Sequence, residues 1–499
     1  MESIAQSAIS SLKEAGLGDV LYIPGQQAYE ARRESYWALT SRQKPWAFVQ
    51  PRNTDEVSKI VGYDLPNFPA DTRLSRSNTP LGTVVLMNIA NEYRDSGGHM
   101  VHAGAGNNIE DGVTIDFGLM TGTTYYPETG LASILPGSRW RDVYADVEKH
   151  GVMVAGGREG MVGVGGFLTG GGITFYNCRY GWGCDQVVNY EVVLGDGSVI
   201  EANATTNVDL FRVLKGGHNN FGIVTRFDMQ TFKASDIWDG NSVISPACTD
   251  QVIEAYVDFS NNLAKNVDSH VLTMFTFLPF AQEHFINILF TSLDGVESPR
   301  TLQKFLEIPG QKDTKTTTVA KKIAEFILPS GRYDSWMTTT FKIDYRIMRK
   351  TVDAFEILLE ELKRAIPDNN FCVNLVFQPL LTSWTQNSVD RGGNVLGLEQ
   401  ITEDCVVVII GVEVATFELS EKVSKPATRQ MFSEVESYAT SLDKNIDFLY
   451  LNYCDGSQDP LRSYGEENVK KMKEASVKYD PTGVFQKRVP GGYKISKVN

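Results

Sequence analysis

The hydrophobic and polar positions divide the chain into three zones. Between residues 36 and 233, short β-branched runs alternate with glycine, which predicts short strands joined by tight turns. Between about 240 and 445, segments with helical apolar spacing alternate with apolar runs typical of strands. This second zone is therefore expected to form a separate domain, an antiparallel sheet covered by helices. Its predicted strands include SHVLTMFTFLPF, FCVNLVFQPLL and DCVVVIIGVEVA, and its predicted helices TVDAFEILLEELKRAI and TRQMFSEVESYATSLD.

The third zone runs from residue 446 to the end. The segment FLYLNYCD is predicted to be a strand, and a charged helix, YGEENVKKMKEASVKYD, follows and stops at Pro481. Side chains alternate between the two faces of a strand, so Tyr450 and Asn452 would share one face. Tyr453 would then lie on the opposite face.

Composition and charge exclude several classes of protein. A chain of 499 residues is too long for one ordinary core, and its 42% hydrophobic content is typical of a globular protein. The net charge of -14 argues against binding to nucleic acid or to an anionic membrane. The N-terminal segment lacks the apolar core of a signal peptide, and the six cysteines show no CxxC spacing. A cytoplasmic location is expected, and the sequence does not indicate an oligomeric state.

Glycine is concentrated in one segment. Nine of the seventeen residues at positions 156–172, GGREGMVGVGGFLTGGG, are glycine. Ordering so many glycines costs conformational entropy, so we expect the fold to need backbone without side chains there. Backbone N–H groups that surround a pyrophosphate are the usual reason for such a need. The P-loop and Rossmann patterns are absent. The alternative, a flexible linker, is disfavoured because the segment includes Val162, Val164, Phe167 and Leu168.

Two shorter glycine loops support the same interpretation. One is SGGH at positions 96–99, and the other is LKGGHNNFGIVTRFDM, which alone could be an ordinary β-turn. Together with the long segment they predict a dinucleotide cradle. The predicted cofactor-binding residues are Ser96, Gly97, Gly98, His99, Gly160, Gly163, Gly165, Gly166, Gly170, Gly171, Gly172, Gly222, Ile223, Val224 and Asn452.

These blocks occur in an order that resembles a known family. The chain is similar to FAD-linked oxidoreductases of the berberine-bridge-enzyme-like group, within the vanillyl-alcohol-oxidase (PCMH-type) superfamily, and most of all to fungal members of small-molecule biosynthesis. The resemblance implies an α+β fold: a PCMH-type FAD-binding domain of two α/β subdomains and a substrate domain with a helix-covered antiparallel sheet. The implied limits are 1–235 for the FAD domain, 236–445 for the substrate domain, and 446–499 for a segment that returns to the FAD domain.

The resemblance also implies how FAD is held. In the family, the histidine of the SGGH loop is bonded to the flavin 8α-methyl, a role that falls on His99; His102 is a weaker candidate. Many relatives attach the flavin a second time through a cysteine, but the matching residue here is Glu159, so a single covalent attachment is predicted. No metal is expected, since the HxxH pattern at His99 and His102 lacks a nearby acidic or cysteine ligand.

The segment before the SGGH loop departs from the family pattern. Residues 61–95 are atypical because the apolar strand expected directly before Ser96 is missing, and Asp95 stands where an arginine is common. We hypothesise that 61–88 is an insertion, a retained intron or an isoform difference. The loop would then lack its supporting strand, and covalent attachment of the flavin would be compromised.

The predicted catalytic residues are Tyr450, Asn452 and Gln378. The family pattern YxN matches Tyr450 and Asn452, which implies that both face the flavin. A tyrosine base requires a nearby cation, which the sequence does not identify. Asp455 is a competing base, although it is also a typical turn residue. Gln378 is predicted to line the substrate face, with a buried structural role as the alternative.

The favoured function is an FAD-dependent oxidase. It would oxidise a C–O, C–N or activated C–H bond of a small, mostly apolar metabolite, passing hydride to flavin N5 and then electrons to O2, in secondary-metabolite biosynthesis. Two alternatives stay open: a non-redox cyclase of Diels–Alder type on the same scaffold, and an inactive isoform with a disrupted FAD loop. The expected partners are a small-molecule substrate and O2.

Overall fold

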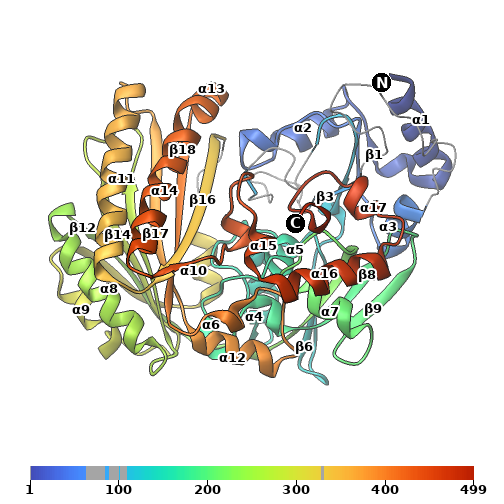
Figure 1. Cartoon of the computed structure of the whole chain (residues 1–499). Helices are drawn as coiled ribbons and strands as arrows, with labels where there is room; N and C mark the ends of the chain where they lie inside the picture. Colours follow the sequence, from blue (N-terminus) through green and yellow to red (C-terminus); the bar gives the residue numbers. More distant parts are fainter. Residues whose placement is uncertain (1, 63–84, 89–99, 102–108, 327–330, 499) are drawn as a thin grey trace.

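The computed structural model describes residues 2–62, 85–88, 100–101, 109–326 and 331–498. Helices and mainly antiparallel sheets occur in separate layers, which confirms the predicted α+β class (Figure 1). The N-terminus lies at one side of the molecule, whereas the C-terminal end of the chain lies near its centre.

A small sheet forms the N-terminal part. Its strand order is β1-β2-β4-β3, with β3 and β2 both parallel to β4. Helices α1 (Glu2–Leu12) and α3 (Thr54–Gly62) belong to the same part, where residues of both contribute to one apolar core. The strands are β1 (Leu21–Tyr22), β2 (Ala47–Val49), β3 (Val85–Asn88) and β4 (Val113–Asp116).

Strand β3 lies within the segment 61–88 that was interpreted as an insertion. Residues 85–88 pair with β4 in parallel, Val85 opposite Val113 and Asn88 opposite Asp116. Residues 89–99, which include the position directly before Ser96, lie outside the described residues. The predicted absence of a strand directly before the SGGH loop therefore stays a prediction.

A second sheet carries the glycine loops. Its order is β5-β6-β10-β8-β9, and all of its pairings are antiparallel. The glycine-rich segment 156–172 lies between the short strand β7 (Val152–Met153) and the residues that lead into β8, and it contains helix α5 (Val164–Thr169). The five strands are β5 (Thr123–Tyr126), β6 (Leu131–Ile134), β8 (Val187–Val193), β9 (Val199–Asn203) and β10 (Ile223–Gln230).

The largest sheet has eight strands, in the order β15-β12-β14-β13-β17-β18-β16-β19, and is antiparallel throughout. Helices α8 (Thr249–Leu263), α11 (Tyr345–Ala365) and α14 (Lys425–Ser441) form a layer over one face (Figure 1). The helix-covered antiparallel sheet is therefore confirmed. The strands are β12 (Ile237–Ile244), β13 (Ser269–Phe277), β14 (Phe285–Ser292), β15 (Gln311–Thr317), β16 (Tyr333–Lys342), β17 (Phe371–Leu380), β18 (Cys405–Val414) and β19 (Asn445–Ile446).

After β19 the chain returns toward the glycine loops. Helix α16 (Glu466–Tyr479) packs on α7 (Val208–Leu214), where Lys478 pairs with Asp209 at 2.7 Å. The predicted strand over FLYLNYCD is wrong: Leu451–Tyr453 is a single 3-10 turn. It is closed by the N–H of Tyr453, which donates to the carbonyl of Tyr450 at 2.8 Å. This turn decides which side chains meet in the site described below.

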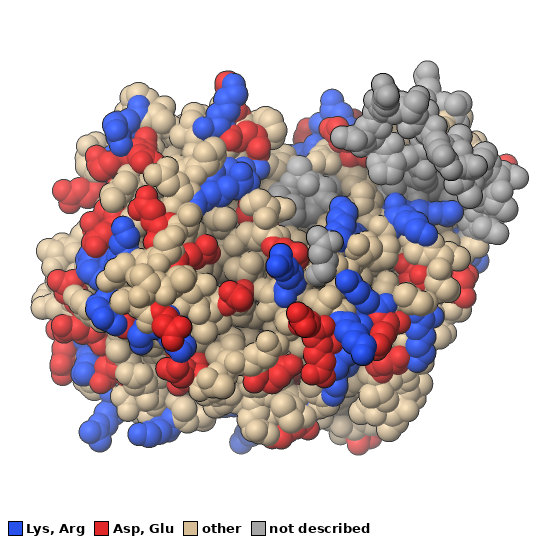
Figure 2. Space-filling model, viewed as in Figure 1, with Lys and Arg blue, Asp and Glu red and all other residues tan. Residues whose placement is uncertain are grey.

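The surface combines both signs of charge. Figure 2 shows lysine and arginine side chains interspersed with aspartate and glutamate over the visible face. Among the described helices, none has both the length and the apolar character that crossing a bilayer requires. All six cysteines are free, and four of them are buried.

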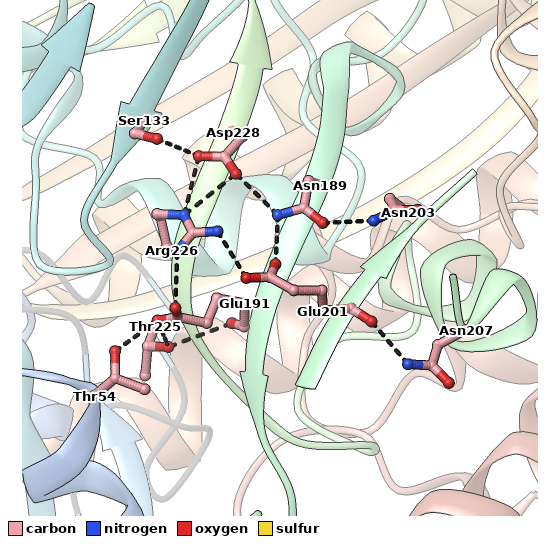
Figure 3. A network of polar contacts seen from close by, with 10 residues as sticks. All are labelled: Thr54, Ser133, Asn189, Glu191, Glu201, Asn203, Asn207, Thr225, Arg226 and Asp228. Carbon is pink, nitrogen blue, oxygen red and sulfur yellow. Dashed lines mark hydrogen bonds and ion pairs between the residues drawn. The ribbon is translucent and has the colours of Figure 1, made fainter. Parts of the chain in front are cut away.

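A polar network on the second sheet is organised by one arginine (Figure 3). Arg226 on β10 pairs with Glu191 at 2.7 Å, with Glu201 at 2.9 Å and with Asp228 at 3.1 Å. The hydroxyl of Thr54 on α3 donates to Glu191 at 2.6 Å, which connects the network to the N-terminal part. The guanidinium thus balances three carboxylates from three adjacent strands.

Replacing Arg226 with methionine would leave these carboxylates without their shared cation. Because the Arg226 side chain is 29% exposed and water screens part of the repulsion, we expect the free energy of unfolding to fall by about 1–2 kcal/mol. Urea denaturation followed by circular dichroism measures the change. As the control, Lys422→Met removes an exposed pair with Glu418 and should change stability by less than about 0.5 kcal/mol. Equal midpoints for the two variants would contradict the expectation.

Candidate flavin and substrate site

The hydroxyl of Tyr450 joins the C-terminal segment to the end of the glycine-rich segment. It accepts hydrogen bonds from the backbone N–H groups of Gly172 at 3.0 Å and Ile173 at 3.2 Å, and from Nδ2 of Asn452 at 2.9 Å. Tyr450 is fully buried, and burial raises its pKa above the usual value. Its ring packs against Trp182, with 5.2 Å between the ring centroids. These contacts hold Tyr450 in one position.

Asn452 approaches the same segment so closely that no side chain fits there. A Cβ added to Gly170 would lie 2.1 Å from Oδ1 of Asn452. The amide also donates from Nδ2 to the carbonyl of Phe167 at 3.3 Å. Gly171 and Gly172 have φ angles of 115° and 92°, which non-glycine residues rarely adopt. Glycine is therefore required at 171 and 172 by the backbone φ angles, and at 170 by the close contact with the C-terminal turn.

Other glycines of the predicted cradle are explained by packing against protein. A Cβ on Gly160 would lie 2.5 Å from the carbonyl oxygen of Ile323 in α10 (Val319–Glu325). A Cβ on Gly222 would lie 2.4 Å from Cγ1 of Val192. Ile223 and Val224 are buried in the two apolar cores at the start of β10. Close packing accounts for these positions whether or not they also contact a ligand.

Packing against the described residues does not require bare backbone at Gly166. The nearest atom to a Cβ added there would be Nε2 of His218, 3.9 Å away, an ordinary contact distance. Gly163 precedes the first residue of α5, and the carbonyl of Gly165 accepts a hydrogen bond from the Thr169 hydroxyl at 2.8 Å. A glycine that packing does not explain fits the cradle predicted for a dinucleotide.

A buried cation adjoins this cradle. Arg139 is 2% exposed and pairs through its backbone with Gly163. Its Nη1 donates to the carbonyl of Met161, whereas Nη2 has no partner among the described residues. Burial lowers the pKa of Arg139 to about 10, and the cations of Arg32 and Arg141 act in the same direction. An orphaned buried cation beside bare backbone fits a cofactor that carries phosphates.

Glu159, at the position where many relatives carry a cysteine, has a structural role. It is buried, and its Oε2 accepts hydrogen bonds from the backbone N–H groups of Met161 at 2.7 Å and Val162 at 2.9 Å. The carboxylate therefore caps the turn that leads into the cradle.

The preceding residue, Arg158, is a site residue that the sequence did not reveal. Its Nη2 donates to the Tyr453 hydroxyl at 2.9 Å and to Oε1 of Gln378, and its Nη1 lies 3.1 Å from Nε2 of His270. The Tyr453 hydroxyl donates to the same Gln378 oxygen at 3.2 Å. These four residues, the Arg158 cluster, join the glycine-rich segment, β13, β17 and the C-terminal turn.

The 3-10 turn explains why Tyr453 belongs to this cluster. In a strand it would face away from Tyr450, but in the turn the two rings lie 4.7 Å apart in an edge-to-face arrangement. Trp336 on β16 contacts the other side of Tyr453, with 6.5 Å between the ring centroids. A single isolated arginine within a glycine-rich segment was the only sequence signal for the cluster.

A small cavity opens beside the Arg158 cluster. Its polar residues include Arg158, His270 and Gln378, and most of the remaining lining is apolar, with Phe175 and Trp384 among it. Burial lowers the pKa of His270 well below its usual range, and the cations of Arg158 and Lys322 act in the same direction. His270 is therefore a neutral side chain at neutral pH.

The structure brings together some of the predicted site residues. Tyr450, Asn452 and Gly170, Gly171 and Gly172 meet directly, and Gln378 joins them through Tyr453. Ser96, Gly97, Gly98 and His99 lie outside the described residues, as does His102. Asp455 instead pairs with Arg429 at 3.1 Å, and its Oδ1 accepts the backbone N–H of Ser457 at 3.0 Å, which makes it a turn residue.

Comparison with known proteins agrees with this geometry. Residues 88–203 match the FAD binding domain family. The FAD-dependent monooxygenase drtC of Aspergillus calidoustus is 32% identical over 503 residues, which cover 100% of this chain and 92% of the relative.

Two solved structures share the fold at low identity. Berberine-bridge-enzyme-like protein 1 of Physcomitrella patens has a TM-score of 0.71 and 15% identity, covering 96% of this chain and 98% of that one. The glucooligosaccharide oxidase of Acremonium strictum, described as holding a 6-S-cysteinyl, 8α-N1-histidyl FAD, has a TM-score of 0.71 and 16% identity, covering 97% and 100%. The chain thus belongs to the family of FAD-linked oxidoreductases that includes this fungal monooxygenase, and it is an FAD enzyme with the berberine-bridge-like, PCMH-type fold.

Proposed function

We propose that the protein oxidises a small, mostly apolar metabolite at the Arg158 cluster, in secondary-metabolite biosynthesis. FAD, when bound, supplies the acceptor for a hydride from the substrate, and O2 restores the oxidised cofactor. The substrate loses a hydride and a proton, and O2 gains two electrons and two protons to leave as H2O2. The observation that carries the proposal is the hydrogen bond between Arg158 and Tyr453, beside the tyrosine that anchors the glycine-rich segment.

The cofactor would be held by bare backbone and by one covalent bond. Gly163, Gly165 and Gly166 at the start of α5 would supply bare backbone, and the SGGH loop would supply His99 for attachment to the flavin. Glu159 caps a turn and cannot form a thioether, which supports a single attachment.

Tyr453 is proposed as the base that accepts the substrate proton. Its hydroxyl accepts a hydrogen bond from Nη2 of Arg158 at 2.9 Å, which orients the phenol oxygen in the site. Tyr450, the residue favoured by the sequence pattern, has its oxygen occupied by three donors, and burial raises its pKa. Tyr450 would position Asn452 and the backbone of Gly172, and Gln378 would orient Tyr453.

A monooxygenase reaction is the second candidate, because drtC bears that name. The two reactions differ in the fate of oxygen: an oxidase releases it as peroxide, whereas a monooxygenase transfers one atom to the product and releases the other as water, with two electrons and a proton supplied as hydride by a reduced nicotinamide and a second proton taken from solvent. Both begin with FAD in the same site, so ¹⁸O2 incorporation into the product separates them.

Anaerobic mixing of the purified holoprotein with fungal metabolite extracts tests the proposed reaction. A redox substrate should bleach the absorbance that oxidised flavins show at about 450 nm. Air should restore this absorbance, with release of peroxide. Conversion of a metabolite with the yellow colour unchanged would point to a cyclase and contradict the proposal. Folded protein that contains no FAD would contradict it at an earlier step.

The covalent attachment is tested by acid precipitation. We expect flavin absorbance in the pellet for the natural chain, because a covalent bond survives unfolding. His99→Ala should move the flavin to the supernatant, whereas the control His102→Ala should leave it in the pellet. Flavin in the supernatant from the unaltered chain would show that the cofactor is bound without a bond to His99.

Substitutions at the two tyrosines should have different effects. Tyr453→Phe removes the proposed base and should slow flavin reduction by about 10²- to 10⁴-fold with FAD content unchanged. Tyr450→Phe leaves the N–H groups of Gly172 and Ile173 without their acceptor and should mainly lower FAD content and thermal stability. Stopped-flow reduction and the flavin-to-protein absorbance ratio measure the two effects. A larger loss of rate per bound flavin for Tyr450→Phe would assign the base to that residue instead.

A further inference from the structure

No carboxylate among the described residues balances the charge of Arg158. Each of its three hydrogen-bond partners is neutral when Tyr453 is protonated: the Tyr453 phenol, the Gln378 amide, and His270, whose pKa burial lowers well below its usual range. Within the described ranges, Arg158 forms no ion pair with a carboxylate. The side chain is nevertheless half-buried, so part of its hydration is lost without an anion in exchange.

The two nearest candidates for a counter-ion are committed elsewhere. Glu159, the next residue in sequence, directs Oε2 at the backbone N–H groups of Met161 and Val162. Asp239 on β12 pairs with Lys322, the other cation that acts on His270, and also accepts a hydrogen bond from Thr291 at 3.1 Å. Asp239 thus balances Lys322, and Arg158 has no carboxylate partner among the described residues.

Arg158 also keeps donors available. A guanidinium has five N–H groups, and the contacts of Arg158 use two on Nη2 and one on Nη1. The Nε–H and the second Nη1–H make no hydrogen bond within the described part of the chain. These two donors lie on different edges of the guanidinium plane, and either one can donate to an oxygen of an anion.

The surroundings of this cation are apolar and aromatic. Phe175 contacts the His270 ring edge-to-face, with 5.0 Å between the ring centroids, and lines the cavity together with Trp384. Trp336 lies on the other side of Tyr453. An anion bound at Arg158 would therefore be drawn from water into a site of low polarity, where its attraction to the guanidinium is strong.

From this arrangement we infer that Arg158 is a specificity residue that selects a substrate with an anionic oxygen group, a carboxylate, on an otherwise apolar skeleton. The inference rests on the proposed function, because it identifies the substrate class of the same site. One carboxylate oxygen would accept a hydrogen bond from a donor of Arg158 that the protein leaves available, on Nη1 or Nε. The rest of the molecule would extend along the aromatic side chains toward Tyr453, so that charge recognition fixes which carbon meets the base.

Binding of matched acids and amides to the FAD-loaded protein tests this inference without a turnover assay. The probes are benzoate with benzamide, cinnamate with cinnamamide, and hexanoate with hexanamide, and affinity is measured by isothermal titration calorimetry. Each pair has similar shape and differs in charge. We expect at least one carboxylate to bind about tenfold or more tightly than its amide, because a charge-assisted hydrogen bond to the guanidinium replaces a neutral one.

Three variants assign the preference to Arg158. Arg158→Gln should reduce the preference to less than about twofold, and Arg158→Lys should retain part of it. Arg179→Gln is the matched control, because Arg179 is also half-buried but already pairs with Asp268. It should keep the preference of the unaltered chain. The flavin-to-protein ratio and thermal midpoint of each variant establish that the folded holoprotein is compared.

Two results would overturn the inference: a panel in which no carboxylate binds more tightly than its amide, or a preference that survives in Arg158→Gln. Both are distinct from failure of the proposed function. If the flavin is never reduced by any metabolite but the carboxylate preference follows Arg158, the site binds anions and the oxidase proposal fails. If the flavin is reduced by neutral metabolites and no acid is preferred, the oxidase proposal stands and Arg158 has a positioning role.

Discussion

The site depends on the approach of the C-terminal turn to a stretch of backbone that has no side chains. The Tyr450 hydroxyl accepts the N–H groups of Gly172 and Ile173, and Asn452 occupies the space that a Cβ of Gly170 would need. These contacts join residues about 280 positions apart in sequence. They bring Tyr453 beside Arg158, and so the proposed base, the cation and the proposed cofactor cradle share one location.

The glycine-rich segment therefore has two physical roles. Its last part is bare because protein packs against it, at Gly170 and Gly172. Its middle part, around Gly166, is not bare because of packing against the described residues. It lies in the same segment as Gly163, which pairs with the buried cation Arg139, and this arrangement suits a phosphate-bearing cofactor. Arg158, at the start of the segment, contacts the large sheet through His270 and Gln378. One segment thus connects cofactor binding with substrate binding, and a change in it affects both.

Much of the fold could be predicted from the sequence, because the spacing of apolar residues shows which face of a helix or strand is buried, without knowledge of distant residues. The strands at 269–277, 371–380 and 405–414 and the helices at 345–365, 425–441 and 466–479 follow the predicted patterns. The predictions that failed concerned the path of the backbone and the distant residues that it brings together. Leu451–Tyr453 has an alternating composition but turns, because the Tyr493 hydroxyl donates to the carbonyls of Cys454 and Asp455 from another part of the chain. Arg158 could not be assigned, since its partners lie more than 100 residues away.

The return of the chain to the glycine loops after residue 446 also fixes the order in which parts of the enzyme can be completed. The ribosome synthesises residues 450–498 after the glycine-rich segment and the large sheet, so the amides of Gly172 and Ile173 have no Tyr450 to bond with until then. The apolar residues of α16 that pack on α7 are absent over the same period. The eight-stranded sheet, whose strands all lie between residues 237 and 446, can form earlier. The site therefore depends on a segment that is made after the strands of both main sheets.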